Sequence, residues 1–335
     1  MIKPNLILVH PIIILITVQT FREFIRRKIG AGSKETMKFS VLIATRNRPD
    51  DLVPCLRTVL ALDYADYEVV VLDQSTSDAS ERAVREAFGA EERLRYLRSE
   101  TVGKSVALNL LIEAACGELL ALTDDDTVVP PDWLTAIETA FQEVPEADIL
   151  FGQVHADSKN SCLPDAHIPA LYFQERRWLK HGEVAGMGAN MAMRRETALR
   201  TGRFDTLMGP GTELYAAEEG DFIYRAQKAG ARILLEPSVK LVHLAWRPSD
   251  EWSRVLFYYG TGDAAFALKH VRCRDWRMIG PLVCRAGYIF ARLCYRLLCR
   301  RPHQEEHYLR GYWNGVKQSL RYRIDPRTRL FVPPR

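Results

Sequence analysis

The feature that most constrains this chain is a regular alternation of short β-rich runs with helical stretches over residues 39–122. The runs predict four strands, at residues 39–45, 67–73, 94–97 and 117–122. The stretches between them predict helices: one capped by Asp50, one capped by Ser77 or Asp78, and one over residues 104–115. This βαβαβαβ order is typical of a mostly parallel sheet with helices on both faces, so we expect an α/β fold.

The second half of the chain is less regular. Pro130 and Pro131 interrupt the pattern, and Asp132 is expected to begin a helix that runs to Phe141. The further predicted elements are a strand at 149–154, a loop at 158–169, a flexible segment that becomes a strand at 186–193, helices at 196–201 and 219–229, and strands at 232–235 and 239–243.

Polar side chains follow three of the predicted strands, at residues 45–47, 73–75 and 124–126. Ligands of open α/β sheets bind outside the carboxyl ends of the strands, and parallel strands bring those ends to one edge. The convergence of three polar clusters therefore predicts a binding site at this edge.

The strongest of these clusters is the carboxylate run Asp124, Asp125 and Asp126. Adjacent carboxylates raise one another's pKa values unless a cation neutralises them. An Asp-x-Asp at a strand end suits Mg²⁺ or Mn²⁺, hard ions that take oxygen ligands and bridge phosphates. The alternative is a solvated acidic turn, and the position after a buried strand favours the metal.

Composition excludes several classes of protein. The 46 Lys plus Arg and 42 Asp plus Glu leave a net charge of only +4, so we expect no nucleic acid partner. The seven cysteines are odd in number and form no C-x-x-C pair. A disulfide framework is therefore not expected, and a reducing compartment is the better hypothesis.

Residues 1–36 are apolar at first and then basic. The run 6–18 is short for a membrane span, which needs about 20 residues, and Arg22, Arg26, Arg27 and Lys28 follow it. Two interpretations stay open: an anchor that leaves the rest of the chain cytoplasmic, or a segment outside the fold, with translation starting at Met37.

The C-terminal region is basic. Residues 271–335 contain 15 Lys plus Arg and 4 Asp plus Glu. Residues 275–300 predict a helix with Arg285, Arg292, Arg296 and Arg300 on one side and apolar residues on a neighbouring face. Such a helix either lies in an anionic membrane surface with its arginines at the head groups or packs on the catalytic domain. The aromatic residues before it stack on a ligand or belong to the core: Trp246, Trp252, Phe257, Tyr258 and Tyr259.

Six segments in a fixed order resemble the family-2 glycosyltransferases of the GT-A fold. The family's opening strand and loop resemble residues 40–49, and its second strand resembles 69–78. Its Gly-to-Asn helix start is similar to 103–109, and its Asp-x-Asp motif to 122–126. Its acceptor-side segment is similar to 188–196 with 202–205, and its Glu-Asp helix motif to 217–221. The resemblance covers residues 38–247 and implies a Rossmann-like, mostly parallel sheet flanked by helices.

The resemblance also implies roles for individual residues. The donor-binding residues would be Thr45, Arg46, Asp73, Lys104, Asn109 and Asp124. Asp126 would ligate the metal, with His243 as a further ligand, and Glu219 would be the catalytic base. Asn190 and Glu218 would lie on the acceptor side.

Blander roles stay open for several of these residues. Asp73 could be a turn residue, and Asn190 could be a loop residue that bonds backbone rather than an acceptor contact. Glu218 and Asp221 could simply favour a helix N-terminus, and His243 could be a core histidine. The sequence also departs from the family pattern: Gln74 follows Asp73, and a Glu stands at 219 where the motif has Asp.

The resemblance implies metal-dependent, inverting transfer of a sugar from a nucleotide diphosphate donor to a saccharide or lipid-linked acceptor, as in cell-surface polysaccharide or glycolipid synthesis. We expect a catalytic domain over residues 37–248 and a helical extension over 249–335, peripheral on the cytoplasmic face of the plasma membrane. The alternatives are a catalytically inactive nucleotide-sugar-binding scaffold at a membrane and a nucleotidyltransferase, which should carry a glycine-rich phosphate loop. A dehydrogenase is excluded because no G-x-G-x-x-G follows the first strand.

Overall fold

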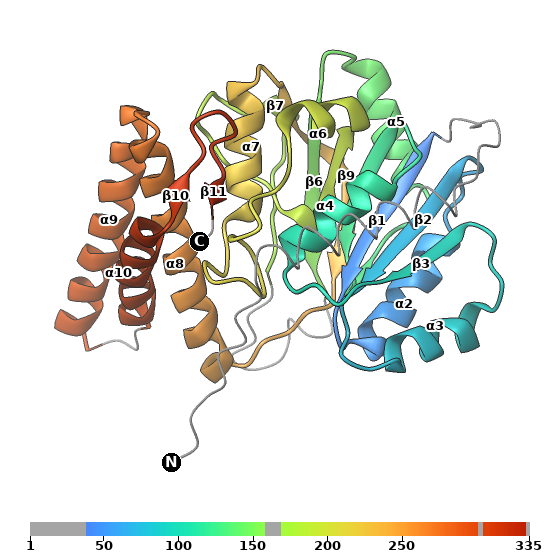
Figure 1. The fold of residues 1–335 in the computed structure, drawn as a ribbon, viewed down its shortest axis with the longest axis horizontal. Helices are drawn as coiled ribbons and strands as arrows, with labels where there is room; N and C mark the ends of the chain where they lie inside the picture. Colours follow the sequence, from blue (N-terminus) through green and yellow to red (C-terminus); the bar gives the residue numbers. More distant parts are fainter. Residues whose placement is uncertain (1–37, 158–168, 301–303, 333–335) are drawn as a thin grey trace.

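The computed structural model describes residues 38–157, 169–300 and 304–332. The predictions for residues 1–36 and for nearly all of the loop at 158–169 lie outside the described residues. Figure 1 shows an α/β part built on one large sheet and, beside it, a group of C-terminal helices.

The sheet has the strand order β3-β2-β1-β4-β8-β6-β9-β5, and β7 pairs with β9. Neighbours β3, β2, β1 and β4 are parallel, as are β6 and β9, whereas β8 is antiparallel to both β4 and β6. The strands are β1 (Phe39–Thr45), β2 (Tyr67–Asp73), β3 (Leu94–Arg98), β4 (Leu119–Asp124), β5 (Thr127–Val128), β6 (Ile149–Ala156), β7 (Arg177–Trp178), β8 (Met191–Arg194) and β9 (Ile233–His243). The mixed α/β architecture predicted from the sequence is confirmed.

Helices cover both faces of the sheet because successive strand residues point to opposite sides. Val41 and Ile43 pack under the face covered by α2 (Pro49–Leu60), α3 (Ala79–Phe88) and α5 (Trp133–Glu143). Leu42 packs on the opposite face with α4 (Lys104–Ala114), α6 (Arg195–Thr201) and α7 (Glu218–Lys228). In Figure 1 the carboxyl ends of β1, β2 and β3 converge on the lower side of the sheet.

Two local predictions are wrong. Arg48, not Asp50, precedes the first residue of α2, because Pro49 takes the first helical position, where its missing N–H costs nothing. The two strands predicted at 232–235 and 239–243 form one strand, β9, which passes an irregularity in its pairing with β6 between Gly152 and Gln153.

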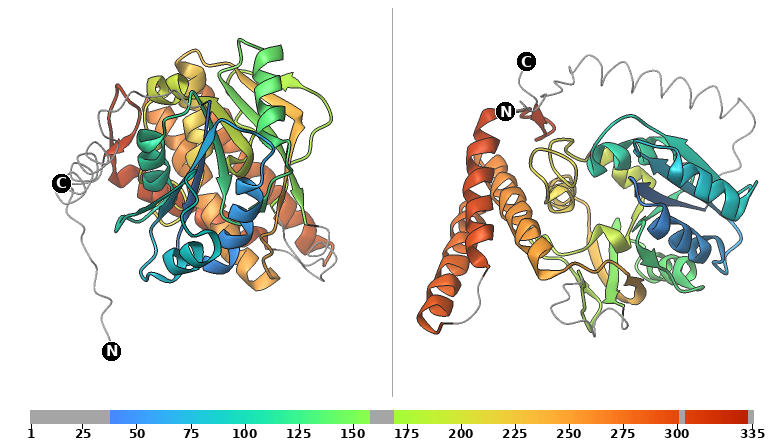
Figure 2. Two further views of the ribbon diagram at one scale, coloured as in Figure 1. Left: turned by 90° about the vertical axis from the view of Figure 1, so that its right-hand side faces the viewer. Right: turned by 90° about the horizontal axis from the view of Figure 1, so that it is seen from below.

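The C-terminal region consists of α8 (Ser249–Arg272), a 3₁₀ turn η3 (Trp276–Met278), α9 (Ile279–Leu298), α10 (Glu305–Arg321) and the small hairpin β10 (Arg323–Ile324) and β11 (Phe331–Val332). Helices α8 and α10 approach closely at small residues: a Cβ on Gly311 would lie 2.0 Å from the carbonyl oxygen of Phe257. Figure 2 shows α8 between α10 and the α/β part. Within the described residues, no helix has both the length and the apolarity that a membrane crossing requires.

The predicted helix at 275–300 is present as η3 and α9, and three of its arginines contact α10 while their side chains stay 33–55% exposed. Arg292 and Arg296 pair with Glu305 of α10, at 2.7 and 3.2 Å. Arg285 donates to the hydroxyl of Tyr308. The exposed side of α9 is its apolar side, with Val283 and Phe290 about 60% exposed.

Candidate active site

The carboxyl ends of β1 and β4 bring the first group of polar residues together. The two strands are parallel neighbours, so Thr45 lies next to the Asp triplet. Its hydroxyl donates to Asp125 Oδ2 at 2.7 Å. The Arg48 guanidinium reaches across from the start of α2 and donates to Asp125 Oδ1 at 2.7 Å and to Asp126 Oδ2 at 2.8 Å. Asp125 thus has a partner for each oxygen and fixes the loop.

Helices α4 and α7 supply the second group. Lys104, the first residue of α4, places its ammonium 2.7 Å from Asp124 Oδ1 and 3.5 Å from Glu219 Oε1. Gly188 allows Glu219 to lie there, because a Cβ at this position would come within 2.1 Å of Glu219 Oε1. Lys104 therefore connects the Asp triplet to the start of α7.

A third group could hold a divalent cation. Donor atoms of Asp124, Asp126 and His243 all lie within 4.8 Å of one another. His243, the last residue of β9, has Nε2 3.4 Å from Asp126 Oδ1. Among the described residues, neither Asp126 Oδ1 nor His243 Nδ1 has a hydrogen-bond partner, although both are buried. Unpaired buried oxygen and nitrogen donors beside a carboxylate fit Mg²⁺ or Mn²⁺.

Two buried carboxyl groups of the site have raised pKa values. Burial raises the pKa of Asp125 to about 7, against the opposing effect of Arg48. Burial and the neighbouring Glu219 raise the pKa of Glu218 to about 8. Burial would lower the pKa of Lys104, but Asp124, Glu219 and Glu218 raise it well above its usual value, so Lys104 stays charged. The two cations Lys104 and Arg48 face five carboxyl groups, a deficit that a divalent ion would reduce.

The other residues predicted for donor binding are placed as follows. Arg46 is exposed at the end of β1. Asp73 is buried, accepting from the Ser75 backbone N–H and the Tyr96 hydroxyl, both at 2.7 Å. Asn109 is also buried, and its amide bonds the backbone N–H and carbonyl of Phe204. These hydrogen bonds favour a structural role for Asp73 and Asn109, in which their side chains hold nearby backbone in place.

The two acceptor-side predictions differ in their surroundings. Asn190 is 1% exposed, accepts from the Trp133 indole and donates to the carbonyl of Gln153. These bonds join Asn190 to α5 and β6, and the bond to the carbonyl of Gln153 favours the alternative of a residue that bonds backbone. Glu218 is 5% exposed beside Gly209, at the first turn of α7.

Sequence reasoning missed one residue of this site, Arg48, and named another, Tyr259, only among aromatic residues that stack on a ligand or belong to the core. Arg48 was not predicted as a partner of the Asp triplet, although its place three residues after Thr45 brings it within reach. Tyr259 of α8 is close enough to the site that Glu219 and Glu218 oppose the ionisation of its hydroxyl, which burial already disfavours, and its pKa is raised. Its only signal was the cluster of aromatic residues around it.

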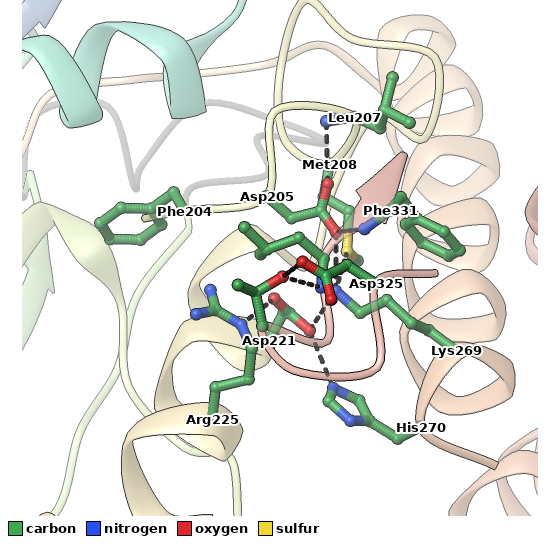
Figure 3. A network of polar contacts seen from close by, with 12 residues as sticks. Phe204, Asp205, Leu207, Met208, Asp221, Arg225, Lys269, His270, Asp325 and Phe331 are labelled. Carbon is green, nitrogen blue, oxygen red and sulfur yellow. Dashed lines mark hydrogen bonds and ion pairs between the residues drawn. The ribbon is translucent and has the colours of Figure 1, made fainter. Parts of the chain in front are cut away.

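A separate buried network lies on the other side of α7, between this helix and α8 (Figure 3). Lys269 of α8 is completely buried, with its ammonium 2.8 Å from Asp205 Oδ2 and 2.5 Å from Asp221 Oδ1. Arg225 and His270 also bond Asp221, at 2.8 and 2.9 Å. The backbone N–H of Phe331 donates to Asp205, so the network ties α7 to α8 and to the C-terminal hairpin.

Comparison with known proteins places this geometry in context. Residues 40–201 match the family described as glycosyl transferase family 2. A glucosyl-dolichyl phosphate glucuronosyltransferase of Haloferax volcanii is 24% identical over 231 residues, which cover 66% of this chain and 74% of the relative. A beta-monoglucosyldiacylglycerol synthase of Trichormus variabilis is 27% identical over 160 residues, 44% of this chain and 34% of the synthase.

Among solved structures, the mannosyltransferase PcManGT of Pyrobaculum calidifontis, in complex with GDP-Man and Mn²⁺, superposes with a TM-score of 0.57. The match covers 91% of this chain and 95% of that chain at 16% identity, so it establishes the fold.

Proposed function

This chain is a family-2 glycosyltransferase with a GT-A fold, and from that premise we propose that it transfers a sugar, with inversion and with a divalent cation, from a nucleoside diphosphate donor to a saccharide or lipid-linked acceptor. One observation carries the proposal. A single edge of the sheet brings together the Asp triplet, His243, Lys104 and Glu219.

The metal proposal rests on the unpaired donors of Asp126 and His243. These two residues would hold Mg²⁺ or Mn²⁺, with Asp124 beside them. When bound, the cation acts as a Lewis acid that offsets the negative charge on the departing diphosphate. Asp124 and Lys104 would contact the donor from the opposite side, with Thr45 and Arg46 at the mouth of the nucleotide pocket.

Glu219 is the better candidate for the base. An acceptor hydroxyl needs a carboxylate within hydrogen-bond reach to take its proton, an effect worth about 10²–10⁴-fold. The pKa of Glu218, raised to about 8 by burial, leaves it mostly protonated at neutral pH. The side chain of Glu219 is 24% exposed and lies 3.5 Å from the Lys104 ammonium, which supports a base that an acceptor hydroxyl can reach.

The acceptor class is proposed from the relatives. One acts on a dolichyl phosphate-linked substrate by its name, one makes a glycolipid, and a third, of Rhizobium meliloti, is a succinoglycan biosynthesis protein. We extend this to a role in polysaccharide or glycolipid synthesis at the cytoplasmic face of the plasma membrane. Residues 37–248 would be the catalytic domain and 249–335 the extension that meets the membrane.

A donor screen tests the proposal. Purified protein would be incubated with UDP-, GDP- and dTDP-sugars, with Mn²⁺ or Mg²⁺ and with chelator, and release of nucleoside diphosphate would be measured. We expect metal-dependent release from one donor, lost in Asp126→Ala. Metal-independent release, or binding of no donor by folded protein, would contradict the proposal and favour the inactive scaffold.

A further inference from the structure

A groove of about 600 Å³ lies between α8, α9 and the start of α10. Its lining combines three arginines of α9, Arg285, Arg292 and Arg296, with aromatic side chains that include Trp252 and Tyr259 of α8. None of these residues belongs to the Asp triplet or to the buried network of Figure 3. The groove is therefore a second concave site.

The charges of the groove suit an anion. Glu305 is the one carboxylate among its lining residues, and it is paired with Arg292 and Arg296. Asp263 is 3.7 Å from Arg285, beyond hydrogen-bond distance. The side chains of Arg285 and Arg292 are 55% and 46% exposed, so their guanidinium groups can still donate. Arginine forks match phosphate oxygens in geometry as well as in charge.

Tyr259 links the groove to the candidate active site. This residue lines the groove and contacts Trp252 edge to face, with ring centroids 6.1 Å apart. Glu219 and Glu218 influence the pKa of the same hydroxyl, which burial raises. In Figure 1, α8 begins and α9 ends on the lower side of the molecule, the side toward which the carboxyl ends of β1–β3 point.

The outer side of α9 suits an apolar chain. The only charged residues of α9 are the three arginines of the groove. Beside the groove, large apolar side chains stand in solvent: Val283, Phe290, Leu297 and Leu298 are 52–84% exposed. Such an exposed apolar surface next to a cationic groove fits a ligand that has both an anionic group and a hydrocarbon chain.

We infer that this groove binds the phosphate or diphosphate of a lipid-linked acceptor, with the three arginines on the phosphate oxygens, the lipid chain along the outer side of α9, and the sugar end directed past Tyr259 to Glu219. This inference rests on the proposed transferase function and names the acceptor class for it. The pairing with Glu305 holds Arg292 and Arg296 in place in the free protein.

Calorimetric titration of the full chain with farnesyl diphosphate tests the inference. Chelator is present so that no metal-dependent binding occurs at the Asp triplet. Arg292→Gln should weaken binding about tenfold, and Arg285→Gln should weaken it too, because each removes a charged donor. Glu305→Gln should strengthen binding about threefold, because it removes the competing carboxylate. Arg310→Gln, an exposed arginine of α10 outside the groove, should leave the affinity unchanged.

Arg292→Gln and Glu305→Gln break the same ion pair. If the pair were purely structural, losing either partner would change the affinity in the same direction. Opposite changes in affinity at positions 292 and 305 therefore support the inference. Inorganic pyrophosphate and farnesol should each bind about tenfold more weakly than farnesyl diphosphate. Equal affinity for pyrophosphate and farnesyl diphosphate, weakening in both the Arg292 and Glu305 variants, or no binding would overturn the inference. The same protein without chelator, titrated with Mn²⁺ and donor, reports on the proposed function separately. A melting curve for each variant checks that it is folded.

Discussion

Helix α7 separates two clusters of acidic side chains that differ in how completely they are paired. In the α7–α8 cluster (Asp205, Asp221, Arg225, Lys269 and His270), every carboxylate oxygen has a donor. In the strand-end cluster (Asp124, Asp125, Asp126, Glu218 and Glu219 with Lys104 and Arg48), Asp126 Oδ1 has none. Burial would raise the pKa of Asp221, but Lys269 and Arg225 lower it, whereas the pKa values of Asp125 and Glu218 are raised.

The difference in pairing indicates that one cluster stabilises the fold and the other serves the function. Buried charges whose partners are all supplied by the chain hold elements together, and removing one partner leaves an uncompensated charge. Buried carboxylates that outnumber their partners reduce stability until something else supplies the missing charge. The α7–α8 cluster is therefore a structural joint, and the strand-end cluster is the place for a cation and a donor.

The largest effect is expected at Glu219. Glu219→Gln removes the candidate base without changing its size, so transfer should fall about 10²–10⁴-fold while stability changes little. Transfer rates under saturating donor and a melting curve would measure both. Glu86→Gln, an exposed position of α3, is the control. An unchanged transfer rate in Glu219→Gln would show that another residue is the base.

The next effect tests the structural joint. Lys269→Met keeps the length of the side chain but leaves Asp205 and Asp221 without their shared cation, so the free energy of unfolding should drop by about 3–5 kcal/mol. Urea unfolding would measure it, with Lys317→Met on the exposed side of α10 as the matched control. A drop no larger than that of the control would show that the α7–α8 cluster does not hold α8 to α7.

A smaller effect is expected at Gly188. An added Cβ would meet Glu219 Oε1 at 2.1 Å, so Gly188→Ala must displace that carboxylate. Because a misplacement of about 1 Å can cost on the order of 10²-fold, transfer should fall by about that factor while the fold is kept. Gly280→Ala in α9, where a Cβ meets nothing within 4 Å, should behave as wild type in the same assay.

The smallest effect concerns pH. The pKa of Glu218 is raised from 4.5 to about 8 by burial, so its protonated form is favoured in the folded state. Its contribution to stability is present below the unfolded pKa and is lost as pH rises through 8. We compare the free energy of unfolding of Glu218→Gln and wild type in the presence of chelator. As the pH rises from 5 to 9, the variant should become more stable relative to wild type by about 1–3 kcal/mol. If the difference in free energy of unfolding between Glu218→Gln and wild type is the same at the two pH values, this account is contradicted.

Sequence reasoning found the strand-end site because its signals are local. A buried β run followed by polar residues fixes the sheet edge to which those residues belong, and this holds for Thr45, Asp73 and Asp124. Lys104 was named from its motif, but two other cations were missed because they reach across elements: Arg48 from just before α2, and Lys269 from α8. The arginines of α9 were found as a row, but their pairing with Glu305 depends on how α10 packs, which helical periodicity does not encode.

The most direct test of the comparison is the free energy of unfolding with and without Mn²⁺ and a nucleoside diphosphate, measured for wild type, Asp126→Asn and Asp205→Asn. A ligand at 100 times its Kd stabilises by about 2.7 kcal/mol. Without ligand, Asp205→Asn should have a lower free energy of unfolding than wild type, and Asp126→Asn should be close to wild type. With ligand, we predict this gain in wild type and in Asp205→Asn, and no gain in Asp126→Asn. A full gain in Asp126→Asn, or its loss in folded Asp205→Asn, would contradict the assignment of function to one cluster and stability to the other.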